Sequence, residues 1–152
     1  MKTIIITGAG SGMGEATAKL LAENPKNALI LIGRSKTRVD QVLQQLANRE
    51  NHSTLAMDIC NAEGLREGLS ELLTNKSVEC VFANAGVGGE NIYGEGDRWQ
   101  EIIQTNLTGT YNTIMEAMPY LKKSKERFKH VVITSSCLAR FGVPNYTAYC
   151  TA

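Results

Sequence analysis

The stretch Thr7-Gly8-Ala9-Gly10-Ser11-Gly12-Met13-Gly14 decides the fold of this chain. It follows a short β-branched run at Thr3–Thr7 and leads into an apolar helical stripe, so it lies at a strand-to-helix junction. Three of its glycines are spaced GxxxGxG, a variant of the turn that holds the diphosphate of a dinucleotide. In such turns one glycine makes the tight bend, one lets the backbone approach the diphosphate, and one lets helix and strand pack closely.

The spacing alone is weak evidence, because a chain with 14 glycines in 152 residues can match it by chance. Its position directly after the first strand makes it informative, and a purely structural glycine turn is the alternative. If the turn binds a dinucleotide, the residues expected to contact it are Gly8, Ser11, Gly12, Met13 and Gly14.

Outward from this turn, short apolar runs alternate with helical stripes. The runs are continuous, which is typical of strands covered on both faces; they are Thr3–Thr7, Ala28–Ile32, Ser53–Met57, Glu79–Ala83 and His130–Thr134. Each stripe has helical spacing and is expected to bury one helix face: Met13, Ala16, Leu20 and Leu21; Val39, Val42, Leu43 and Leu46; Leu65, Leu69, Leu72 and Leu73; and Ile103, Leu107, Ile114 and Met118, with Pro119 ending the last helix. This rhythm predicts right-handed βαβ crossovers and an α/β fold with a parallel sheet between helices.

Length and charge narrow the class of protein. A chain of 152 residues has room for one domain with a sizeable core. Its 16 Lys and Arg against 15 Asp and Glu give a net charge of +1, which is no basic excess for nucleic acid. The opening apolar run is shorter than the roughly 7–15 residues of a signal peptide core, and no stretch approaches the ~18 apolar residues of a membrane span. We therefore predict a cytoplasmic protein with no nucleic-acid or membrane partner.

The four cysteines give no metal signature. Cys60, Cys80, Cys137 and Cys150 form no CxxC pair, and neither histidine lies near one of them at the spacing of a zinc site. We predict buried or idle thiols in a reducing compartment, and no metal site.

The end of the second strand bears on the choice of cofactor. Ile32-Gly33-Arg34-Ser35 lies twenty residues beyond Gly14. An acidic residue here would bind the ribose 2′-hydroxyl of NAD, whereas an arginine accommodates the 2′-phosphate of NADP. Arg34 and Ser35 are present and no acid is, so the sequence favours NADP(H) over NAD(H), with a solvated Arg34 at a helix start as the alternative.

With these features the chain resembles the short-chain dehydrogenase/reductase family over essentially its whole length. Asp58, followed by Ile59, resembles the family's acidic residue near the adenine ring. Asn84-Ala85-Gly86 matches the motif that supports the central sheet and lines the cofactor site, although Ala83 stands where the family usually has a second asparagine. Asn106 matches the family's catalytic asparagine, and Tyr149 follows Ser136 at the usual offset of 13 positions.

The resemblance implies a Rossmann-type doubly wound sheet of order 3-2-1-4-5, in one NAD(P)-binding domain over residues 1–152. It implies an oxidoreductase that transfers hydride between a nicotinamide and a small-molecule carbonyl or alcohol, assembled as a homodimer or homotetramer; Arg34 and Ser35 make NADP(H) the favoured cofactor. Tyr149 would be the acid/base, Ser136 would hydrogen-bond the substrate oxygen, and Asn106 would hold a backbone site and an ordered water of a proton relay.

The family's last catalytic element is Tyr-x-x-x-Lys, and the sequence ends one residue before that lysine. We therefore expect the N-terminal portion of a longer protein, with the C-terminal part of the fold missing. Two other functions stay open: a nucleotide-binding or regulatory protein that performs no chemistry, and an enzyme that uses NADP(H) in epimerisation or dehydration.

Three of the site residues also have simpler interpretations. Asp58 could cap the helix expected to begin near Asn61, and Asn106 could serve a neighbouring backbone group. Tyr146 is the rival tyrosine, although its offset of ten from Ser136 fits the family poorly.

Overall fold

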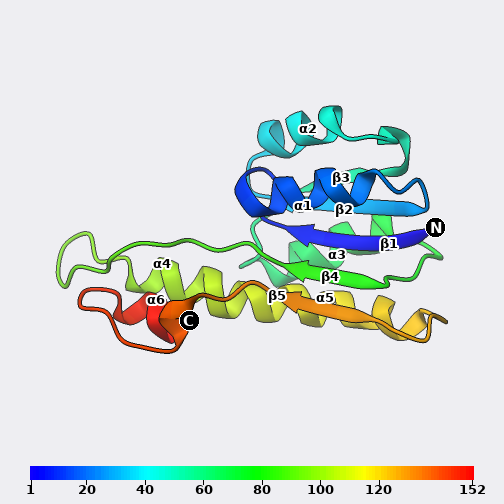
Figure 1. Cartoon of the computed structure of the whole chain (residues 1–152). Helices are drawn as coiled ribbons and strands as arrows, with labels where there is room; N and C mark the ends of the chain where they lie inside the picture. Colours follow the sequence, from blue (N-terminus) through cyan, green and yellow to red (C-terminus); the bar gives the residue numbers. More distant parts are fainter.

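Five parallel strands form one sheet in the order β3-β2-β1-β4-β5 (Figure 1). The computed structural model describes all of residues 1–152. The strands are β1 (Lys2–Thr7), β2 (Asn27–Gly33), β3 (Ser53–Ala56), β4 (Cys80–Ala83) and β5 (His130–Ile133). Each lies within one residue of the run that predicts it, and their order and parallel pairing confirm the Rossmann-type doubly wound sheet.

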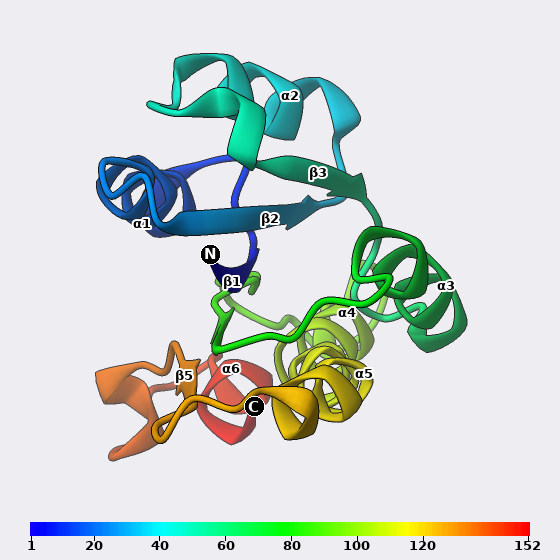
Figure 2. The same ribbon diagram turned by 90° about the vertical axis from the view of Figure 1, so that its right-hand side faces the viewer.

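Helices cover both faces of the sheet (Figure 2). Helices α1 (Gly12–Ala22) and α2 (Lys36–Gln45) pack on one face, against Ile4 and Ile6 of β1. Helices α3 (Ala62–Leu72) and α5 (Thr110–Lys123) pack on the other face, against Ile5. Because successive strand residues point to opposite faces, the isoleucine run of β1 contributes to both halves of the core.

The buried face of α1 differs from the predicted stripe. Met13, Ala16 and Leu20 are exposed, and the helix instead buries Gly14, Ala18 and Ala22 against the sheet. These small residues recur every fourth position and allow α1 to approach β1 and β2 closely. The predicted stripes of α2 and α3 do face the core.

The long helical region is more irregular than its stripe predicts. It runs through α4 (Trp99–Ile103), a π-helical segment η2 (Gln104–Gly109) and then α5. The wider π turn shifts the helix phase, so Leu107 is exposed while Gly109, Thr113 and Ala117 are buried. Pro119 does not end the helix, because Ala117 and Leu121 on either side of it pack into the core and offset its lost hydrogen bond.

The fifth strand is an edge strand with exposed faces. Its four residues, His130–Ile133, are all exposed, contrary to the expectation that every strand is covered on both faces. β5 pairs with β4 only. The chain then continues through the single 3-10 turn η3 (Cys137–Ala139) to the short helix α6 (Thr147–Thr151). A second 3-10 turn, η1 (Arg49–Asn51), precedes β3. None of the helices is both long and apolar enough to cross a lipid bilayer.

Candidate functional site

The glycine turn connects β1 to α1 through three different local geometries. Gly8 has φ +67°, and Gly12 has φ +56°, values that favour glycine. Gly14 has no room for a side chain, because a Cβ there would lie 2.3 Å from the carbonyl oxygen of Gly8. At Gly12 a Cβ would meet no atom within 4 Å. Gly8 therefore makes the bend, Gly14 allows close packing, and Gly12 borders open space.

The N-terminus of α1 is left free to receive an anion. Its N-cap, Ser11, has extended backbone and makes no side-chain hydrogen bond to the helix. The N–H groups of the first turn have no intrahelical partner, and together with the helix dipole they favour negative charge. The open space beside Gly12 adjoins this turn, so the local geometry fits the diphosphate of a dinucleotide.

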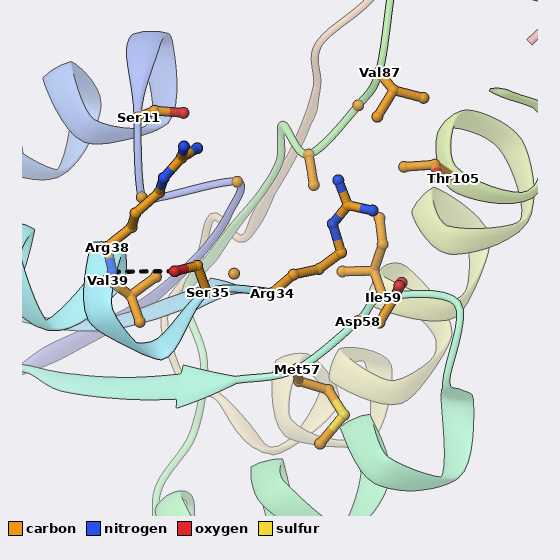
Figure 3. Close-up of a pocket in the computed structure, with 15 residues that line it drawn as sticks. Ser11, Arg34, Ser35, Arg38, Val39, Met57, Asp58, Ile59, Val87 and Thr105 are labelled. Atoms are coloured by element: carbon orange, nitrogen blue, oxygen red, sulfur yellow. Dashed lines mark hydrogen bonds between the residues drawn. The ribbon is translucent and has the colours of Figure 1, made fainter. Parts of the chain in front are cut away.

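A cavity of about 240 Å³ opens beside the turn at the carboxyl ends of the strands (Figure 3). Its polar wall contains Ser11, Arg34, Ser35 and Arg38. Arg38 points toward Ser11, whereas Arg34 extends across to the wall formed by Ile59 and Thr105 (Figure 3). Two arginine side chains thus face this cavity from the end of β2 and the start of α2.

Asp58 and Ile59 lie on the opposite side of the same cavity. The Asp58 carboxylate accepts a hydrogen bond from the Cys60 amide (2.9 Å). It does not cap α3: that N-cap is Asn61, whose Oδ1 accepts from the Gly64 amide at 3.0 Å. The capping interpretation of Asp58 is therefore wrong.

Asn84 connects three strands at the centre of the sheet. Its Nδ2 donates to the Thr7 carbonyl (3.2 Å), and its Oδ1 accepts from the Thr134 hydroxyl (3.0 Å). The Thr7 hydroxyl in turn accepts from the amides of Asn84 (3.0 Å) and Ala85 (3.1 Å). Ala85 and Gly86 continue from this junction into the cavity wall.

Thr7 is a supporting residue that motif matching alone does not reveal. It is buried at the last position of β1, and its hydroxyl holds the start of the Asn84-Ala85-Gly86 segment 77 residues away in sequence. The only sequence signal is a β-branched hydroxyl residue directly before Gly8.

Asn106 lies in the π-helical segment and is bound to the backbone of Val87. Its Oδ1 accepts from the Val87 amide (2.8 Å), and its Nδ2 donates to the Val87 carbonyl (2.9 Å). Asn106 does therefore serve a neighbouring backbone group. In doing so it fixes the chain that leaves Asn84-Ala85-Gly86, and single π turns of this kind are frequent at functional sites.

A second cavity, of about 410 Å³, brings the three candidate catalytic residues together. Asn106, Ser136 and Tyr149 all line it, as do Met13 and Asn84. Ser136 is the N-cap of the 3-10 turn η3, and Tyr149 lies in the adjoining short helix α6. The Ser136 hydroxyl accepts from the Leu138 amide at 3.2 Å.

Tyr146 lies outside the residues that line this cavity and contacts Tyr149 edge to face, with ring centroids 6.3 Å apart. The geometry therefore selects Tyr149 over Tyr146 as the tyrosine of the cavity.

The cysteines are free, and none belongs to a metal-binding group. Cys60 lies beside the first cavity, where its thiol donates to the Gln104 carbonyl (3.3 Å). Burial, followed by the neighbouring Asp58, raises the pKa of the Cys60 thiol. This thiol is consequently a poor nucleophile at neutral pH.

A doubly wound parallel sheet, with a glycine turn that leaves room for a diphosphate and two cavities beside it at the strand ends, defines a nucleotide-binding protein of the Rossmann class. The chain belongs to the short chain dehydrogenase family, whose sequence profile matches residues 2–152.

Relatives and solved structures agree with this assignment. An uncharacterized oxidoreductase of Listeria innocua is 31% identical over 153 residues, which cover 97% of this chain and 60% of that protein. The alcohol dehydrogenase of the archaeon Thermococcus sibiricus, complexed with 5-hydroxy-NADP, superposes with a TM-score of 0.86 at 29% identity, covering 99% of this chain and 65% of that one. Carveol dehydrogenase of Mycobacterium avium, in complex with NAD, gives 0.84 at 25% identity, covering 99% and 60%. The chain thus spans about 60% of the length of the curated relatives it matches.

Proposed function

We propose that residues 1–152 form one nucleotide-binding domain of an NADP(H)-dependent oxidoreductase acting on a carbonyl or alcohol. The observation that carries this proposal is the convergence of Asn106, Ser136 and Tyr149 on one cavity. Met13 lines the same cavity and directly follows Gly12, so the proposed catalytic groups and the diphosphate hollow are neighbours.

Each residue has a distinct role in this proposal. The nicotinamide cofactor supplies or accepts the hydride when bound. The Tyr149 hydroxyl gives a proton to the substrate oxygen during reduction and takes it back during oxidation. The Ser136 hydroxyl holds that oxygen against Tyr149, and Asn106 fixes the wall of the cavity through Val87.

The preference for NADP(H) rests on charge at the end of β2. Arg34, Ser35 and Arg38 line the first cavity. The end of β2 has no acidic side chain that could bind the ribose 2′-hydroxyl of NAD. A phosphate group would gain charge-assisted hydrogen bonds from the guanidinium groups. Solved relatives carry either NAD or an NADP derivative, so the preference itself is our proposal.

Fluorescence titration with NADPH and NADH tests the cofactor preference. We expect Arg34→Ala and Arg38→Ala each to weaken NADPH binding about tenfold or more, because a hydrogen bond to a charged group contributes ~1.5–3 kcal/mol. Binding of NADH should change much less. Lys36→Ala is the matched control, since the Lys36 ammonium pairs with Asp40 and does not line the cavity. Tighter binding of NADH than of NADPH by the unmodified protein would overturn the preference.

Turnover of a carbonyl panel by the complete encoded protein tests the chemistry. Tyr149→Phe should lower kcat at least about 100-fold, the usual contribution of a positioned acid or base. Tyr146→Phe is the matched control and should keep most of the activity, because its ring lies outside the cavity. If both variants retain full activity, Tyr149 is not the acid/base. If the protein reduces no carbonyl yet binds NADPH, a binding function replaces the enzymatic one.

We also propose self-association and a cytoplasmic location. Leu107, Tyr111 and Met115 are exposed large side chains on the long helical region, and burying them against a second copy would give a homodimer or homotetramer of the complete protein. Sedimentation of the complete protein, compared with a Tyr111→Glu variant, tests this. The four free thiols favour a reducing compartment.

A further inference from the structure

The loop between β4 and α4 contains one buried residue among exposed and half-buried ones. Asn91 is 1% exposed, whereas the next two residues, Ile92 and Tyr93, are 65% and 76% exposed. The loop also holds five glycines, at 86, 88, 89, 94 and 96, so its backbone is intrinsically permissive. Something other than local propensity must therefore hold Asn91 inside.

Asn91 makes two hydrogen bonds with the segment that carries Tyr149. Its side-chain Oδ1 accepts from the Ala148 amide at 3.0 Å, and its own amide donates to the Asn145 carbonyl at 2.7 Å. Ala148 is fully buried and directly precedes Tyr149. Asn91 thus binds α6 across 57 positions of sequence.

The helix has no side-chain cap of its own. The N-cap residue, Tyr146, makes no side-chain hydrogen bond, so the first-turn amides of α6 depend on partners from elsewhere. Asn91 supplies an acceptor to one of them. Its Nδ2 is buried without a hydrogen-bond partner, a cost that stability alone does not explain.

The same loop also passes beside the tyrosine ring, because Gly88 and Tyr149 line one cavity. A Cβ on Gly88 would lie 3.7 Å from Cε2 of Tyr149, in ordinary van der Waals contact. Arg98 holds this end of the loop, since its Nη1 donates to the Gly88 carbonyl (2.9 Å) while its Nε donates to Glu101 (2.8 Å). The loop therefore meets Tyr149 from one side and the amide before it from another.

We propose that Asn91 is a positioning residue that sets the orientation of Tyr149 toward Ser136. This inference rests on the proposed function for its effect on turnover, but not for its effect on α6. Asn91 does not line either cavity. It acts through the first turn of α6, which would fray without a cap, and an error of about 1 Å in a catalytic group can cost about 100-fold in rate.

The test compares three variants of the complete encoded protein. Asn91→Leu keeps the side-chain size and removes the acceptor, and Asn91→Asp restores an acceptor that caps helices well. Asn27→Leu is the matched control: Asn27 is also buried, and its Nδ2 donates to the Leu21 carbonyl (2.9 Å) at the opposite end of the strands. Amide exchange at Ala148, NADPH affinity and kcat are measured for each.

We expect Asn91→Leu to speed exchange of the Ala148 amide at least about tenfold and to lower kcat by about 10- to 100-fold. NADPH affinity should stay within about twofold, because Asn91 lines neither cavity. Asn91→Asp should recover most of the protection and of kcat, whereas Asn27→Leu should lower thermal stability with kcat preserved. If Asn91 had a merely structural role, Asn91→Leu would lower thermal stability and preserve kcat, as expected for Asn27→Leu.

Two results overturn the inference. One is an unchanged exchange rate at Ala148 in Asn91→Leu, which would show that Asn91 does not cap α6. This readout does not depend on whether the protein has enzymatic activity. The other is faster exchange with unchanged kcat. Should Asn91→Leu fail to fold, the milder Asn91→Ser, which keeps a shorter acceptor, takes its place in the same comparison.

Discussion

One methyl group added to the glycine turn should have opposite consequences at Gly12 and at Gly14. A Cβ on Gly14 would lie 2.3 Å from the Gly8 carbonyl oxygen, so backbone must move by about 1 Å to reach the ordinary contact range that begins at 3.4 Å. Overpacking costs about 1–3 kcal/mol, and a clash with backbone rather than with a flexible side chain places Gly14→Ala at the upper end, about 3 kcal/mol. A Cβ on Gly12 meets no atom, and only its φ of +56° is unfavourable, which costs ~1 kcal/mol.

Thermal unfolding and NADPH titration separate the two effects. At about 3 °C per kcal/mol for a chain of this size, Gly14→Ala should lower Tm by about 10 °C and Gly12→Ala by only about 3 °C. Gly12→Ala should nevertheless weaken NADPH binding at least about tenfold, because its methyl group would occupy the hollow proposed for the diphosphate.

Gly142→Ala is the control, since its Cβ also meets open space without a positive φ and lies away from both cavities. Gly12→Ala protein that binds NADPH within twofold of the unmodified chain would refute the placement of the diphosphate. Equal Tm values for Gly12→Ala and Gly14→Ala would refute the packing argument.

Three further substitutions test other parts of the fold. Thr7→Val should lower the free energy of unfolding by about 2–4 kcal/mol in urea titrations, because two backbone amides lose their acceptor; a neutral result would contradict that role. Pro119→Ala should raise Tm by a few degrees, since it restores a helix-interior hydrogen bond, and no gain would mean that the helix is already adapted to the proline. The side-chain hydrogen bond from Lys36 lowers the pKa of Asp40, so the stability that this pair contributes is lost as the pH falls below about 4. Asp40→Asn should therefore show a shallower loss of Tm between pH 5 and pH 3, and an unchanged slope would contradict the assignment.

The strands could be predicted closely because both faces of the sheet are buried over most of its width. A strand covered on both sides must be apolar at consecutive positions, as Ile4, Ile5 and Ile6 are. Such a run can be recognised from the sequence alone. The helix faces were harder to predict. In α1 the close approach that Gly14 permits selects Ala18 and Ala22 for the core and leaves Leu20 outside.

In the candidate site, the sequence could propose the functional residues but not the residues that hold them in place. The family resemblance proposed Asn106, Ser136 and Tyr149 as the candidate catalytic residues, and the structure places all three on one cavity. Their supports are non-local and had no sequence signal: Asn106 is held by Val87, and the segment before Tyr149 by Asn91. No particular amino-acid composition marks a π turn, so the change in helix phase near Asn106 could be seen only in the backbone of the structure.

The uncovered outer edge of β5 has a practical consequence for handling a sample of residues 1–152. Val131, Val132 and Ile133 present apolar side chains beside a row of unsatisfied main-chain donors and acceptors, the combination on which neighbouring molecules add strand by strand. Concentrated samples should therefore scatter light increasingly with time, and Val132→Lys should suppress that aggregation.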